Sequence, residues 1–64
     1  MPRREVLLIG EMIDAAEQAQ ILVSGRDVDT LAADRQLRDA LLWNFTVLGE
    51  AAAQLPDAVK RAHP

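Results

Sequence analysis

The sequence contains no cysteine and only one histidine, which restricts how so short a chain can be stabilised. Without cysteine there is neither a disulfide nor a thiolate metal site. A lone histidine holds a metal ion only with several carboxylates beside it, so we expect no metal and no other cofactor. A domain of 64 residues buries only about 60% of the surface that its unfolded chain exposes. Such a chain relies on association with another copy, or it is a piece of something larger.

Aromatic residues and long hydrophobic runs are also scarce. Trp43 and Phe45 are the only aromatic residues, whereas half of all residues are hydrophobic, with alanine and leucine dominant. This composition favours helices over strands and argues against disorder. The apolar run at 6–10 is shorter than a secretory signal requires, and no run approaches the roughly 18 residues that span a bilayer. We therefore expect a cytoplasmic protein with no membrane association.

Positive charge is in deficit, because the net charge is −3. Phosphate binding requires a surplus of lysine and arginine, so the chain is not a nucleic-acid binder by charge alone. Two basic pairs occur, Arg35 with Arg38 and Lys60 with Arg61. We interpret them as solvated charges, with Arg38 pairing to Asp34 four residues earlier, rather than as an RNA-binding patch.

The hydrophobic periodicity predicts a first helix over about 3–23. Its apolar residues form two adjacent stripes, one of Val6, Ile9, Ile13 and Ala16, the other of Leu8, Met12, Ala15, Ala19 and Leu22. Gly25 is suited to end this helix in the left-handed conformation. Asp27 or Asp29 is suited to cap the next helical segment.

A second long helix is predicted over about 30–54, opening with a short turn of helix at 30–33. Its main stripe contains Leu37, Leu41, Phe45, Leu48, Ala52 and Leu55. Pro56 either interrupts this helix or opens a third one over about 56–62. The predicted fold class is all-α: an antiparallel two-helix hairpin, plus the start of a third helix, belonging to a helical bundle.

Each long helix has an apolar face that is wider than one neighbouring helix can cover. Two helices alone rarely form a stable monomer. The sequence therefore predicts a missing surface, supplied by a second copy or by further chain. Because wide exposed apolar faces rarely stay unpaired, we expect a homodimer or a higher oligomer.

The stretch "WNFTVLGEAAAQLPDAVKRAHP", 43–64, resembles the HepT-like branch of the HEPN superfamily. In that family a long second helix carries "GEA", followed by a variable segment and "hP". The resemblance implies that 1–64 form part of a dimeric, all-helical HEPN domain. It also implies a metal-independent endoribonuclease toxin, paired with a nucleotidyltransferase-type antitoxin.

The family's catalytic motif is an arginine and a histidine a few residues apart, often followed by a tyrosine, and it comes after the "hP". This sequence ends at Pro64 and contains no tyrosine. Arg61 and His63 stand too close together for that motif, and His63 matches the "hP" position. We therefore expect no catalytic residue in this chain, which is interpreted as the N-terminal part of a HepT-like ribonuclease. The alternative is a non-catalytic helical module for dimerisation or partner binding.

Three residues of the second helix are candidates for supporting roles. The resemblance implies that Glu50, the acidic residue of "GEA", faces the catalytic region and orients catalytic groups; the alternative is an exposed helix glutamate. Asn44 lies within the apolar stripe, where it must find hydrogen-bond partners, so we expect a polar contact inside the bundle. Gly49 is expected to permit close approach of another backbone or a bulky side chain, so that Gly49→Leu disrupts assembly.

Overall fold

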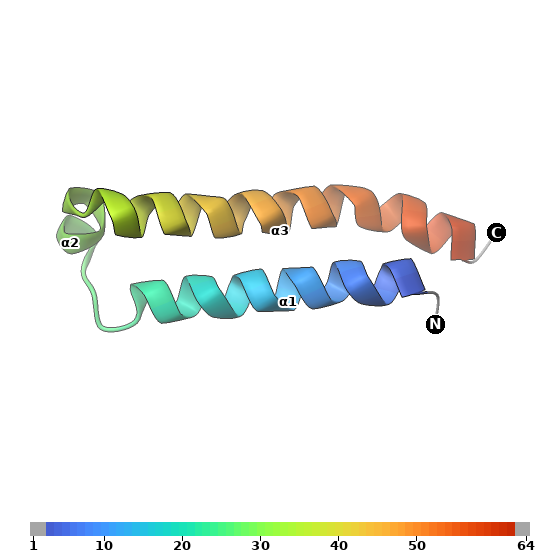
Figure 1. Cartoon of the computed structure of the whole chain (residues 1–64), viewed down its shortest axis with the longest axis horizontal. Coiled ribbons are helices and arrows are strands. Elements are labelled where there is room, and N and C mark those ends of the chain that lie inside the picture. The colour runs from blue at the N-terminus through green and yellow to red at the C-terminus, as the bar shows by residue number, and fades with distance from the viewer. Residues whose placement is uncertain (1–2, 63–64) are drawn as a thin grey trace.

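The computed structural model describes residues 3–62 and contains three α-helices: α1 (Arg3–Val23), α2 (Val28–Ala33) and α3 (Arg35–Ala62). The described residues contain no strand, so the predicted all-α class is confirmed. The two long helices lie side by side and antiparallel, with α2 at one end and both chain ends at the other (Figure 1). The resulting rod extends over 47 × 16 × 14 Å.

The turn after α1 forms as its sequence predicts. Gly25 has a φ of 71°, the left-handed conformation that glycine adopts without steric cost. The Arg26 side chain donates a hydrogen bond of 2.8 Å to the carbonyl oxygen of Leu22, so it satisfies one of the last carbonyls of α1. Asp27 then caps α2 by accepting a 2.8 Å hydrogen bond from the backbone N–H of Thr30.

The Asp27 cap makes helix α2 sensitive to acid. Hydrogen bonds from the backbone and side chain of Thr30 lower the pKa of the Asp27 carboxyl. Stabilisation by the charged cap is therefore complete above the pKa of an aspartate in the unfolded chain, about 3.9. It is lost as the pH falls through the lower pKa of Asp27 in the folded state. Asp27→Asn keeps a hydrogen-bond acceptor but does not titrate. Between pH 5 and pH 2 we expect this variant to lose less of its helical circular-dichroism signal than the wild-type protein. Identical acid titrations of both proteins would contradict this assignment.

Asp34 separates α2 from α3, so the second long helix begins at Arg35 rather than near residue 30. Its carboxylate accepts a 3.1 Å hydrogen bond from the N–H of Leu37, and its own N–H donates to the carbonyl of Thr30. The expected Asp34–Arg38 pair is wrong. Arg38 instead donates to the carbonyl oxygen of Ala32 at 3.0 Å, because the Asp34 carboxylate is engaged as a helix cap.

Helix α3 continues through Pro56 to Ala62, so the predicted helix boundary at Pro56 is wrong. Proline removes the N–H that would bond to the carbonyl of Ala52, which weakens the helix locally. The turns on either side of the proline remain packed, since Leu55 packs against the buried core cluster and Ala58 is 4% exposed. Packing on α1 thus offsets the missing hydrogen bond, and 56–62 extend α3 instead of starting another helix.

The core is a narrow line of contact between α1 and α3. The residues concerned are buried or half-buried and recur at alternating spacings of three and four, the spacing of a coiled-coil interface. Leu8, Ala51 and Ala58 form its buried cluster, with Met12 and Leu55 packed against them. We call the whole set the seam: Glu5, Leu8, Met12, Ala15, Ala19 and Leu22 of α1, and Leu37, Leu41, Asn44, Leu48, Ala51, Leu55, Ala58 and Ala62 of α3.

The seam corrects the predicted stripes in both helices. In α1 the stripe containing Leu8 is packed, whereas Val6 and Ile13 of the other stripe are 49% and 54% exposed. In α3, Phe45 is 52% exposed and Asn44 occupies the seam beside it. Glu5 is only 5% exposed because it lies three residues before Leu8 on the packed line.

Candidate functional site

The seam divides the surface of the hairpin into two flanks of different chemistry. In a right-handed helix the residue after each seam residue is rotated by 100° to one side, and the residue before it by 100° to the other. Because α1 and α3 are antiparallel and face each other, the same direction of rotation leads to the same flank on both helices. The hairpin therefore has one flank built from following residues and one built from preceding residues.

The flank built from following residues is almost entirely apolar. We call it the apolar face. Its members are Val6, Ile9, Ile13, Ala16, Gln20 and Val23 of α1, and Arg38, Leu42, Phe45, Gly49, Ala52, Pro56 and Val59 of α3, of which only Gln20 and Arg38 are polar.

The opposite flank, the polar face, is mostly hydrophilic. It contains the hydrogen bond of 3.0 Å from the Arg4 guanidinium to the Gln54 side-chain oxygen, which joins the two helices. Three large exposed apolar side chains also lie there, Leu7 at 54%, Ile21 at 62% and Trp43 at 67% exposure. Its charged and amide side chains are Arg4, Glu11, Asp14, Gln18, Gln36, Glu50, Gln54, Asp57 and Arg61.

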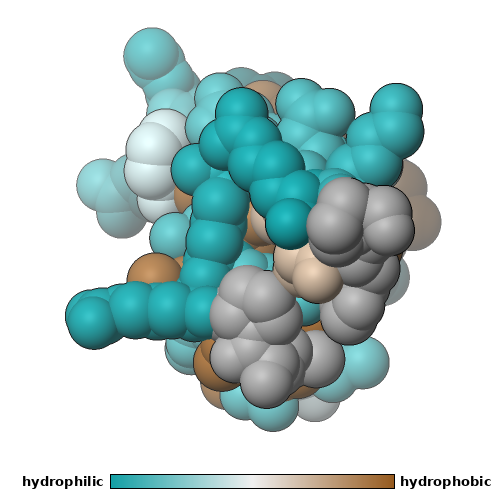
Figure 2. Space-filling view, turned by 90° about the vertical axis from the view of Figure 1, so that its right-hand side faces the viewer, coloured by the Kyte–Doolittle hydropathy of each residue, from teal (hydrophilic) through white to brown (hydrophobic). Residues whose placement is uncertain are grey.

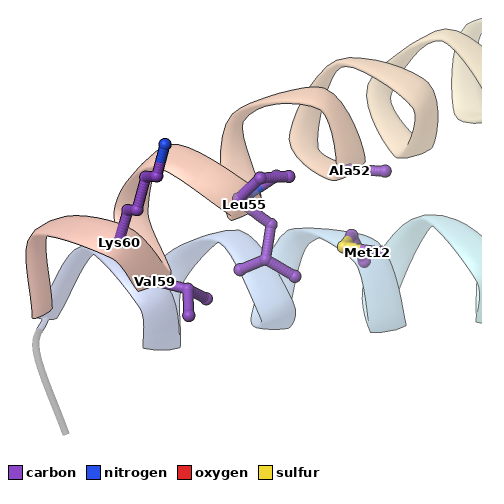
Figure 3. A pocket seen from close by; sticks show the side chains of 6 residues that line it. Met12, Ala52, Leu55, Val59 and Lys60 are labelled. Carbon is purple, nitrogen blue, oxygen red and sulfur yellow. The ribbon is translucent and has the colours of Figure 1, made fainter. Parts of the chain in front are cut away.

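An open groove of about 560 Å³ lies on the apolar face near the end that carries the chain termini. Met12 of α1 lines one side of this groove. Ala52, Leu55, Pro56, Val59 and Lys60 of α3 complete its lining. In Figure 3 the side chains of Leu55 and Val59 extend from α3 toward α1, whereas the Lys60 amine points away from it. The groove therefore suits an apolar side chain, with a cation only at its rim.

The residues predicted to have supporting roles lie on different sides of α3. Glu50 is exposed on the polar face, and within residues 3–62 no hydrogen bond or ion pair engages its carboxylate. Asn44 is part-buried in the seam, where its amide donates a 2.9 Å hydrogen bond to the carbonyl oxygen of Ala40 in the same helix. Its hydrogen-bond partner thus comes from its own helix and not from a neighbour.

Gly49 lies on the apolar face between Phe45 and Ala52. Beyond its own helix backbone, no heavy atom of the described chain comes within 4 Å of the position that a β-carbon would take there. The close approach predicted for Gly49 is therefore not made by this chain, and it stays a prediction for contact with another molecule.

The end of the hairpin that carries both termini is largely hydrophilic over its visible described surface (Figure 2). Arg61 is exposed there, while His63, the other member of the dismissed Arg61–His63 pair, lies outside the described residues. Within residues 3–62 no group of histidine or acidic side chains is arranged to hold a metal ion. None of the helices in that range is long and apolar enough to cross a membrane.

The fold and its surface define a class of protein: an all-helical hairpin that has one apolar and one polar flank. A family model described as ribonuclease HepT-like matches residues 12–63, which is most of the chain. The chain therefore belongs to the HepT-like ribonuclease family. Searches of curated proteins and of solved structures found no match.

Proposed function

We propose that the protein functions as a toxin-type, metal-independent endoribonuclease of the HEPN kind, in which these residues form the structural hairpin. The observation that carries this proposal is the family match over 12–63. The matched region includes the "GEA" residues and nearly all of α3, so it covers the helix that the resemblance associates with the catalytic region.

The proposal assigns no catalytic residue to the 64 positions. General acid–base catalysis requires a titratable group within hydrogen-bond reach of the proton that it moves. The sequence has a single histidine, His63, and no tyrosine. Because Arg61 and His63 stand too close together for the family motif, the proposal places the catalytic arginine and histidine outside these positions. Glu50, exposed on the polar face, is placed to orient such groups if they pack on that flank.

The proposed partners follow from the same family. We propose a cytoplasmic homodimer that is held inactive by a nucleotidyltransferase-type antitoxin and acts on RNA when released. A second candidate function, non-catalytic dimerisation or partner binding, is favoured by the apolar face. The two functions differ in whether the complete gene product cleaves RNA.

The test compares the 64-residue chain with the protein that its source cell produces. The intact mass of the cellular protein is measured first, against the 7.0 kDa of this chain. Both proteins are then incubated with RNA in excess EDTA. We expect the cellular protein to exceed 7.0 kDa and to cleave, and the 64-residue chain to leave RNA intact. A cellular protein without nuclease activity would support the binding-module function instead. Cleavage by the 64-residue chain that His63→Ala abolishes would overturn our assignment of the C-terminal residues.

A further inference from the structure

We propose that α1 packs on α3 in two ways, which differ by a rotation of α1 about its own axis of about 100°, the angle between successive helix residues. The structure shows the first packing, in which the α1 residues of the seam contact α3. In the second, less populated packing, the residue that follows each of them takes its place. This inference concerns a switch within the hairpin and does not depend on the proposed ribonuclease activity.

The two apolar stripes of α1 correspond to each other position by position. The packed stripe is Glu5, Leu8, Met12, Ala15, Ala19 and Leu22, and the second stripe is Val6, Ile9, Ile13, Ala16, Gln20 and Val23. Each stripe has five apolar residues and one polar residue at the same 3–4 spacing. Rotation therefore exchanges Leu8 for Ile9 and Met12 for Ile13, and exchanges of similar volume between apolar residues disturb a core least. Helix α3 thus meets a comparable apolar surface in either stripe.

The polar residue of each stripe opposes its own packing, at opposite ends of α1. Near the chain termini the packed stripe buries Glu5, which is 5% exposed, while Val6 of the second stripe is left 49% exposed. Near α2 the packed stripe has Ala19, whereas the second stripe has Gln20. Burying a carboxylate or an amide costs free energy that burying an aliphatic side chain does not. Neither packing therefore has a large advantage over the other.

The turn after α1 is built so that it can follow a rotation of the helix. The Arg26 side chain bonds to the carbonyl oxygen of Leu22 in α1 itself, so this contact moves with the helix end. Gly25, with its φ of 71°, gives the turn backbone freedom. The hydrogen bond between Arg4 and Gln54, which joins the two long helices, is exposed, and exchanging it for bonds to water changes the free energy little.

Rotation of α1 changes the chemistry of the apolar face. In the second packing Ile13 and Ala16 enter the seam, and the residues that follow them, Asp14 and Glu17, take their places on that face. The α1 half of the face then carries two carboxylates. Met12, which lines the groove in the structure, turns toward the opposite flank. The first packing therefore displays an apolar surface, and the second packing withdraws it.

Disulfide trapping tests the rotation, since the chain contains no cysteine. Leu8 and Ala58 belong to one buried cluster, and a disulfide requires β-carbons about 4 Å apart. Ile9→Cys with Ala58→Cys therefore closes when Ile9 takes the place of Leu8. Leu7→Cys with Ala58→Cys is the matched control, because Leu7 lies equally far from Leu8 in the other direction.

We expect the Ile9 pair to form an intramolecular disulfide at least about tenfold faster than the Leu7 pair, because the second packing brings only Ile9 to Ala58. Mass spectrometry of protein oxidised at low concentration measures both rates. Equal rates, or no disulfide in either pair, would overturn the proposal.

Two leucine substitutions should shift the populations in opposite directions. Glu5→Leu favours the first packing, whereas Gln20→Leu favours the second. Combined with the Ile9–Ala58 cysteine pair, Glu5→Leu should slow disulfide formation at least about threefold and Gln20→Leu should accelerate it by a similar factor. A change in overall stability alone would move both rates the same way, since each variant replaces a polar residue by leucine. Rates that move in the same direction, or not at all, would contradict the switch.

Dye binding gives the same answer without cysteines, should the double variants fail to fold. Gln20→Leu adds a leucine to the apolar face of the first packing, so a fixed α1 predicts more binding of the apolar dye ANS. The proposed rotation predicts less binding, because it withdraws the face. Circular dichroism checks that the variant stays helical. A rise in dye binding by helical Gln20→Leu would overturn the proposal.

Discussion

Replacing Leu8 by alanine is expected to unfold most of the isolated chain at room temperature. Leu8 is 6% exposed and belongs to the buried cluster with Ala51 and Ala58. Truncating a buried leucine to alanine costs about 2–5 kcal/mol, because the transfer free energy is lost and a cavity remains. A single core in a chain this short rarely supplies more than about 3–5 kcal/mol in total. The loss at one position is therefore comparable to the whole free energy of unfolding.

Leu7→Ala is the matched control, since it removes the same atoms one residue away. Leu7 is 54% exposed on the polar face, so its replacement should change the free energy of unfolding by less than about 1 kcal/mol. Urea titrations followed by far-ultraviolet circular dichroism measure both effects at equal protein concentration. Equal destabilisation by the two substitutions would contradict the assignment of Leu8 to the seam.

Pro56→Ala is expected to stabilise the hairpin by about 1–3 kcal/mol, because proline in a helix interior costs roughly 3 kcal/mol relative to alanine. The structure shows α3 running without interruption through this position. Alanine restores the N–H that can bond to the carbonyl of Ala52, and it removes the clash of the proline ring with that carbonyl. For a chain of this size the thermal midpoint should rise by at least about 4 °C. Differential scanning calorimetry measures the shift.

Pro56→Gly separates the recovered hydrogen bond from helix propensity. Glycine also has the N–H but is about 1 kcal/mol less favourable than alanine in a helix. Its thermal midpoint should therefore lie below that of Pro56→Ala by several degrees. If a helix boundary were located at Pro56, alanine would bring no gain over proline. A midpoint for Pro56→Ala at or below the wild-type value would show that α3 is not continuous in solution.

Much of the candidate site was accessible to sequence reasoning, but its division between two flanks was not. The "GEA" residues and the length of α3 identify the family, and the surplus of apolar surface predicts an interaction face. Which residues form that face depends on which positions of each helix lie in the seam. The assignment of Phe45 to the core failed because the seam contains Asn44 and leaves Phe45 exposed beside it.

The signal for the apolar face was nonetheless present in the pattern. Positions at alternating steps of three and four, counted from Leu8 in the first helix and from Leu41 in the second, mark the seam. The residue that directly follows each of these positions is nearly always apolar or glycine, whereas the residue that directly precedes it is mostly polar. The groove needed the structure, because it depends on Pro56 and Val59 staying in one helix with Ala52. A proline in the sequence favours the opposite expectation.

The all-helical class, the first helix over residues 3–23, the left-handed turn at Gly25 and the family could all be predicted from the amino-acid pattern. These features depend on local propensity, turn chemistry and motif, which act over a few neighbouring residues. The tertiary structure decided which of two apolar stripes is packed, where Glu5 lies, and that α3 passes through Pro56. A wide apolar face is compatible with several packing directions of one helix. Only the contact with the other helix, which buries one narrow line at 3–4 spacing, selects among them.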